Sequence, residues 1–111
     1  MNSSEQERKQ AVFEYALLLG RLKRLPEAEK TVRTHFQQGR EAEGEFLLGD
    51  ILTRLKRNDL YVPLYEKIAA RWPDRAAQAY LRAASACLED HQPDRVLELL
   101  NKLRKLPVEY G

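Results

Sequence analysis

The sequence contains few residues that break helices or cross-link chains. Its 111 residues include 5 Gly, 5 Pro and a single cysteine, Cys87. One cysteine cannot form an internal disulfide, which excludes the disulfide-stapled class of small secreted domains and favours a reducing, cytoplasmic compartment. With so few helix breakers and with 32% charged and 43% hydrophobic residues, a water-soluble and mostly helical domain is predicted.

Long apolar runs and a strong charge of one sign are also absent. No stretch approaches the roughly 20 apolar residues of a transmembrane helix, and the polar N-terminus lacks the apolar core of a signal peptide. The 19 basic and 17 acidic residues leave a formal charge of +2. So small an excess gives little attraction toward nucleic acid or an anionic membrane, so neither is expected as a partner.

Patterns for catalysis and metal binding are missing as well. His35 and His91 are isolated from other metal-ligating residues. Cys87 lies in an alanine-rich stretch, which indicates that it is a small packing residue. The sequence has no Gly-rich phosphate loop and no nucleophile elbow. We therefore expect no enzyme activity, no cofactor and no metal site.

What the chain does contain is a repeated tetrapeptide, Arg-Leu-Lys-Arg, at Arg21–Arg24 and again at Arg54–Arg57. The copies are 33 residues apart, and each closes an apolar helical stretch that is followed by a turn and a second helical stretch. Periods of 20–50 residues indicate solenoids, in which stacked hairpins bury one another's apolar faces. The repeat therefore predicts a binding scaffold.

Apolar residues at helical spacing predict six helices joined by short turns, with consecutive helices antiparallel. The first three are expected at about 5–23, 26–38 and 41–56. Pro63 predicts that the fourth begins only around Tyr61, and Asp74 is the predicted cap of the fifth. Pro93 is predicted to open the last helix, which ends before Pro107.

The residues of these hairpins resemble the tetratricopeptide repeat, a 34-residue helical hairpin. The matching positions are Tyr15-Ala16, Leu19, Ala28 and Val32 in the first unit, Leu48-Gly49, Leu52, Tyr65, Ile68 and Pro73 in the second, and Tyr80, Ala83-Ala84, Cys87, Val96, Leu100 and Leu103 in the third. The resemblance covers about residues 9–107. It implies an all-α, right-handed superhelix of three stacked helix-turn-helix hairpins. These form a single domain, residues 1–111, with repeats at about 9–40, 42–74 and 75–107.

In this family the first helix of each unit lines a concave groove that holds a peptide, and the resemblance implies such a groove here. Carried over by spacing, its lining is Phe13, Leu17, Arg21, Phe46, Asp50, Arg54, Leu81, Arg82, Ser85 and Leu88. The apolar members form a track suited to an amphipathic helix. The alternative, open above all for Leu17 and Leu81, is that they complete the core between hairpins.

The function that the resemblance implies is a non-enzymatic protein-interaction module, acting as a chaperone or adaptor of a larger assembly such as bacterial secretion machinery. Arg24, Lys56 and Arg57 are predicted to lie along a basic edge, where favourable charge at helix C-termini explains them better than an acidic partner. Leu97 lies away from the main apolar stripe of the last helix. A self-assembling homo-oligomer joined through this terminal helix is therefore the alternative, and nucleic-acid binding through the basic edge is a weaker one.

Overall fold

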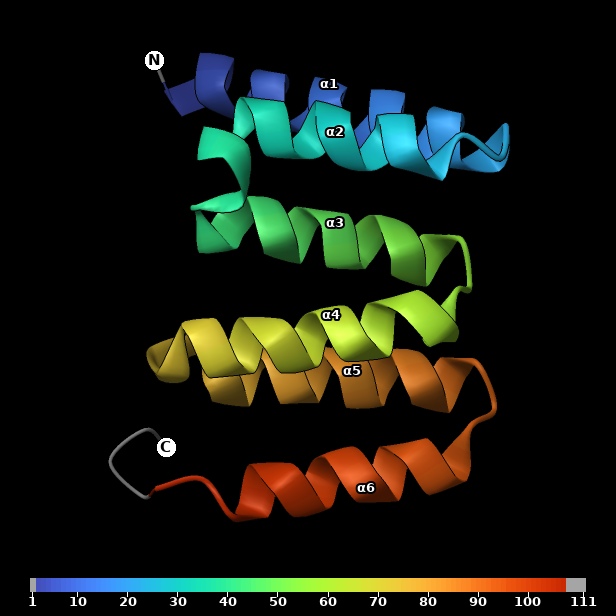
Figure 1. The fold of residues 1–111 in the computed structure, drawn as a ribbon, viewed down its shortest axis with the longest axis vertical. Coiled ribbons are helices and arrows are strands. Elements are labelled where there is room, and N and C mark those ends of the chain that lie inside the picture. Colours follow the sequence, from blue (N-terminus) through green and yellow to red (C-terminus); the bar gives the residue numbers. More distant parts are fainter. Residues whose placement is uncertain (1, 108–111) are drawn as a thin grey trace. The chain divides into compact units, whose positions relative to one another are not determined.

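The structure is a computed structural model that describes the backbone of residues 2–107 and the side chains of residues 4–107 (Figure 1). This part of the chain is all-helical and contains no strand, which confirms the predicted all-α class. Its elements are α1 Asn2–Arg21, α2 Leu25–His35, the 3₁₀ segment η1 Gln37–Gly39, α3 Ala42–Arg54, α4 Asn58–Arg71, the 3₁₀ segment η2 Pro73–Arg75, α5 Ala76–Glu89 and α6 Pro93–Arg104. Among these helices none is both long and apolar enough to cross a bilayer.

The chain divides into two compact units, Met1–Leu55 and Lys56–Gly111. In the first unit α1, α2 and α3 all pack against one another, and in the second α5 packs against both α4 and α6. The boundary falls inside the second Arg-Leu-Lys-Arg copy, so the predicted middle repeat at 42–74 contributes α3 to one unit and α4 to the other.

The first Arg-Leu-Lys-Arg copy forms a helix-ending turn with a defined hydrogen-bond pattern. Lys23 follows the end of α1 with a φ of 65°, and Lys56 of the second copy has a φ of 58°. The backbone N–H of Arg24 donates to the carbonyl of Leu19 at 2.9 Å, and that of Lys23 donates to Gly20 at 3.0 Å. These two bonds around one left-handed residue make a Schellman motif, so the tetrapeptide is a turn signature.

The turn between α5 and α6 has the same geometry without the same sequence. His91 has a φ of 58°, and its N–H donates to the carbonyl of Leu88 at 3.1 Å. The N–H of Gln92 donates to the carbonyl of Cys87 at 2.9 Å. The same Schellman turn therefore joins α1 to α2 and α5 to α6.

The core of the first unit combines apolar burial with a half-buried ion pair. Its buried apolar residues are Val12, Ala16, Leu17, Ala28, Val32, Phe36, Phe46, Leu48, Ile51 and Leu52. Glu45 is only 4% exposed. Arg33 donates to both carboxylate oxygens of Glu45, from Nε at 3.2 Å and from Nη2 at 3.1 Å, and this fork ties α2 to α3. The hydrogen bond to Glu45 is the main cause that raises the pKa of the Arg33 guanidinium.

The second unit is built around the small inward face of α5, whose buried residues are Ala76, Ala79, Ala83, Ala84, Ala86 and Cys87. Small side chains allow α4 and α6 to approach α5 closely. The fully buried Tyr61 of α4 donates its hydroxyl to Asp90 Oδ2 at 2.8 Å, and Cys87 Sγ lies 3.8 Å from the same hydroxyl. Burial is the main cause that raises the pKa of both the phenol and the thiol.

Two predicted helix starts are wrong. The fourth helix begins at Asn58 rather than around Tyr61 and continues through Pro63. It does so because Pro63 is exposed and close to the helix start, where its missing N–H costs one hydrogen bond and its ring faces solvent. Asp74 does not cap the fifth helix: it lies in η2, and the N-cap is Arg75, with no side-chain capping bond.

Candidate functional site

Two of the predicted groove residues lie in the core of the first unit. Leu17 is 2% exposed and Phe46 is 4% exposed. Side chains that are already buried have little surface left to offer a partner. A groove lining therefore cannot include Leu17 or Phe46 without a rearrangement of the unit.

The other predicted groove residues of this unit lie at the surface of α1 and α3. Phe13 is half-buried, and the guanidinium carbon of Arg54 lies 5.9 Å from the centre of its ring, within the range of a cation–π contact. Arg21 is exposed and Asp50 is half-buried. The structure thus brings Phe13 and Arg54 together.

The predicted groove residues of the second unit are the accessible ones. Leu81 is 49% exposed and Leu88 is 63% exposed, and Ser85 between them is also exposed. Their i, i+4, i+7 spacing places all three on one face of α5, which we call the α5 track. Arg82 is half-buried beside it. The track lies opposite the alanine face, so the packing that buries the alanines presents the leucines to solvent.

The predicted basic edge consists of turn residues whose charges are partly matched locally. Arg24 pairs with Glu27 at 2.6 Å, and Arg57 pairs with Asp59 at 2.9 Å. The hydrogen bond from Arg57 lowers the pKa of the Asp59 carboxyl. Lys56 occupies the left-handed position of its turn. These contacts support the explanation that the basic residues are favourable charges at the ends of helices. They give no support to nucleic-acid binding.

The terminal helix α6 buries one leucine and exposes two others. Leu99 is its buried residue, at 2% exposure, whereas Leu100 is 41% exposed and Leu97 is 67% exposed. An ion pair between Lys102 and Glu66 links α6 to α4. A second apolar patch, formed by Leu97 and Leu100, therefore lies on this helix.

Sequence reasoning missed the most exposed apolar face of the first unit. Tyr15 and Leu18 of α1 are 60% and 57% exposed, and Leu22, which directly follows the end of α1, is 68% exposed. With the exposed Ala11 they recur at intervals of four, three and four residues, and we call this set the α1 stripe. That spacing is visible in the sequence and was the available signal.

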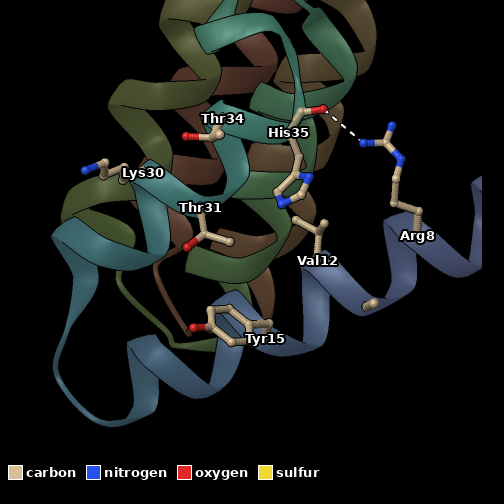
Figure 2. Close-up of a pocket in the computed structure, with 8 residues that line it drawn as sticks. Arg8, Val12, Tyr15, Lys30, Thr31, Thr34 and His35 are labelled. Carbon is tan, nitrogen blue, oxygen red and sulfur yellow. Dashed lines mark hydrogen bonds between the residues drawn. The ribbon is translucent and has the colours of Figure 1, made fainter.

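A groove lies beside the α1 stripe, between α1 and α2 (Figure 2). Its volume is about 520 Å³, and its lining is Arg8, Ala11, Val12, Tyr15, Lys30, Thr31, Thr34 and His35. Figure 2 shows the His35 ring next to Val12, and Arg8 reaching the backbone carbonyl of His35, to which it donates at 3.2 Å. Val12 is the buried member of this lining, and its basic and hydroxyl side chains are exposed or half-buried.

Within the described residues no group of His, Cys, Asp and Glu side chains is arranged to hold a metal ion. In comparisons with known proteins the chain matches no family model, no curated protein and no solved structure.

Proposed function

We propose that this chain is a non-enzymatic protein-interaction module that binds an amphipathic or extended segment of a partner protein, as a cytoplasmic chaperone or adaptor. The observation that carries the proposal is the α5 track. Two leucines of one helix face remain about half or more exposed, although the opposite face of the same helix is fully packed. The resemblance to tetratricopeptide hairpins, with its right-handed superhelix, forms part of the same proposal.

The dimensions of the α5 track suit a helical or extended segment. Leu81 and Leu88 are seven residues apart, or about 10 Å along a helix. Ser85 lies between them, and its small side chain leaves room for an apolar side chain of the partner. A partner that places apolar residues at i, i+3, i+4 and i+7 would contact both leucines. The packed alanine face fixes α5 beforehand, so binding requires little ordering of the helix.

Two substitutions at equally exposed leucines test the role of the α5 track. Leu88→Glu should abolish capture of the partner from the native source, because it places a charge in the centre of the apolar contact. Leu97→Glu is the matched control, since Leu97 is 67% exposed and Leu88 is 63% exposed. Far-UV circular dichroism should be unchanged in both variants. Retention of the same partner by Leu88→Glu would refute the role of the track.

A second candidate, a self-assembling scaffold, is favoured by the patch of Leu97 and Leu100 on α6. Solenoids need a polar cap at their ends, and this helix leaves two leucines exposed instead. The prediction is a particle mass that rises with concentration and that Leu97→Glu returns to the monomer value. A mass that does not respond to Leu97→Glu would remove this candidate.

A further inference from the structure

The α1 stripe is an apolar surface that the first unit does not use for its own packing. Tyr15, Leu18 and Leu22 are each more than half exposed, while the inward face of the same helix buries Val12 and Leu17. The stripe residues alternate intervals of four and three, which is the spacing of the contact line between two coiled helices. The stripe therefore has the pattern of a helix that packs against one more helix.

The same helix also carries a socket for such a partner. Arg8, Ala11, Val12 and Tyr15 line the α1–α2 groove from the α1 side. They stand at i, i+3, i+4 and i+7, the four positions that form the hole for one knob side chain in coiled-coil packing. Ala11 is the small residue of the set, so the hole is open there. Leu22, the most exposed large apolar residue of the stripe at 68%, lies eleven residues after Ala11, in the turn that directly follows α1.

We propose that α1 pairs antiparallel with α1 of a second copy of this chain. Leu22 of each copy enters the hole at Ala11 of the other, and Leu18 of each copy packs on Tyr15 of the other. One register satisfies both contacts, because the midpoint between residues 11 and 22 is also the midpoint between 15 and 18. The interface is therefore isologous, with a two-fold axis between residues 16 and 17.

Charge selects a second copy as the occupant. Glu14 and Arg21 are both exposed and stand seven residues apart on the same flank of the α1 stripe. In the antiparallel register Glu14 of one copy lies opposite Arg21 of the other, and the symmetry makes this pair twice. In a parallel pairing Glu14 of one copy would instead lie level with Glu14 of the other along the helix axis, and Arg21 level with Arg21. Self-complementary charge thus accompanies self-complementary shape.

The measurement is sedimentation equilibrium of the purified chain from about 5 to 500 µM. A contact made by one helix per copy belongs to the small interface class, so dissociation in the micromolar range is expected. Leu22→Glu should raise the dissociation constant at least about tenfold, as loss of a central apolar anchor does. Leu97→Glu tests the rival interface on α6 in the same assay, because Leu97 is 67% exposed there. It should leave the constant unchanged, and so should Leu88→Glu, because the pairing does not depend on the α5 track.

A charge-swap cycle tests the register and provides variants that leave the apolar stripe intact. Glu14→Arg and Arg21→Glu should each weaken the dimer severalfold, and the double variant should restore it. Failure of the double variant to restore association would overturn the antiparallel register. A monomer at every concentration would overturn the proposal, as expected if a different protein occupies the stripe. Loss of the dimer in Leu97→Glu but not in Leu22→Glu would move the interface to α6.

Discussion

Replacing Gly44 by alanine should destabilise the first unit, whereas the same change at Gly20 should not. A Cβ added to Gly44 would lie 2.4 Å from Cβ and 2.7 Å from Cγ of Phe36. The Cβ of Phe36 is fixed to the backbone and cannot move without moving the chain, and the side chain is only 2% exposed, so its ring has little room to rotate away. A Cβ on Gly20 would lie 2.5 Å from Leu55 Cδ1, but the next contacts are at 3.5 Å and the clashing atom ends a flexible side chain.

The magnitudes follow from two opposing effects. Overpacking a core costs about 1–3 kcal/mol. Glycine to alanine in a helix interior gains up to about 1 kcal/mol, and less in a first turn such as the one that contains Gly44. Gly44→Ala should therefore lose about 1–2 kcal/mol of unfolding free energy. At Gly20 a rotation of Leu55 relieves the contact, so the change should lie between zero and a gain of about 1 kcal/mol.

Urea unfolding followed by far-UV circular dichroism is the suitable assay. The single tryptophan, Trp72, belongs to the second unit, so its fluorescence would report mainly on the wrong half of the chain. Equal losses for the two variants, or an unchanged midpoint for Gly44→Ala, would refute the argument that the identity of the clashing atom decides the sign.

Three further predictions concern the ion pair, the buried phenol and the left-handed turn. Arg33→Met should lower the free energy of unfolding in urea by about 2–3 kcal/mol. This is less than the cost of breaking a fully buried pair, because the Arg33 side chain is 38% exposed. Adding Glu45→Leu should recover most of the loss. Tyr61→Phe should cost about 1–2 kcal/mol through the lost bond to Asp90. The pKa of Tyr61 is raised above its ordinary value of 10.0. The difference in unfolding free energy between the wild type and Tyr61→Phe, measured as a function of pH, should therefore be constant below about pH 10 and shrink as the pH rises further. Lys23→Gly should gain about 1 kcal/mol in thermal unfolding, because a side chain at φ 65° is strained and glycine is not; a loss would contradict the assigned turn.

Much of the fold could be predicted because its signals are local. The apolar periodicity gave the helices, and the Arg-Leu-Lys-Arg copies marked the ends of α1 and α3. The errors at Pro63 and Asp74 arose where one residue was weighed alone. Pro63 is tolerated because its position is exposed, and Asp74 loses the cap because Pro73 starts a 3₁₀ turn that places Arg75 there. Exposure and turn geometry depend on neighbours that local patterns do not specify.

The candidate surfaces were harder to predict for a related reason. Leu17 and Leu18 are adjacent in sequence, yet one is 2% exposed and the other 57% exposed. A helix that packs against two others buries a wide arc, and α1 contacts both α2 and α3. Periodicity shows that an apolar arc exists but does not give its width. For this reason the sequence pattern places Phe46 in a groove and does not distinguish the α1 stripe from the buried arc.

The small residues of α5 and the exposed Ala11 of α1 face in opposite directions, and this places the two candidate apolar surfaces. On α5 they face inward and let neighbouring helices approach, so the large leucines face solvent. On α1 the small residue Ala11 faces outward, and a groove remains beside it. The basic turn residues are partly neutralised by local partners, as Arg24 is by Glu27, and add little long-range attraction. The binding proposed for these surfaces should therefore depend on apolar shape, with charge selecting the register, and it should persist at salt concentrations that abolish binding to phosphate backbones.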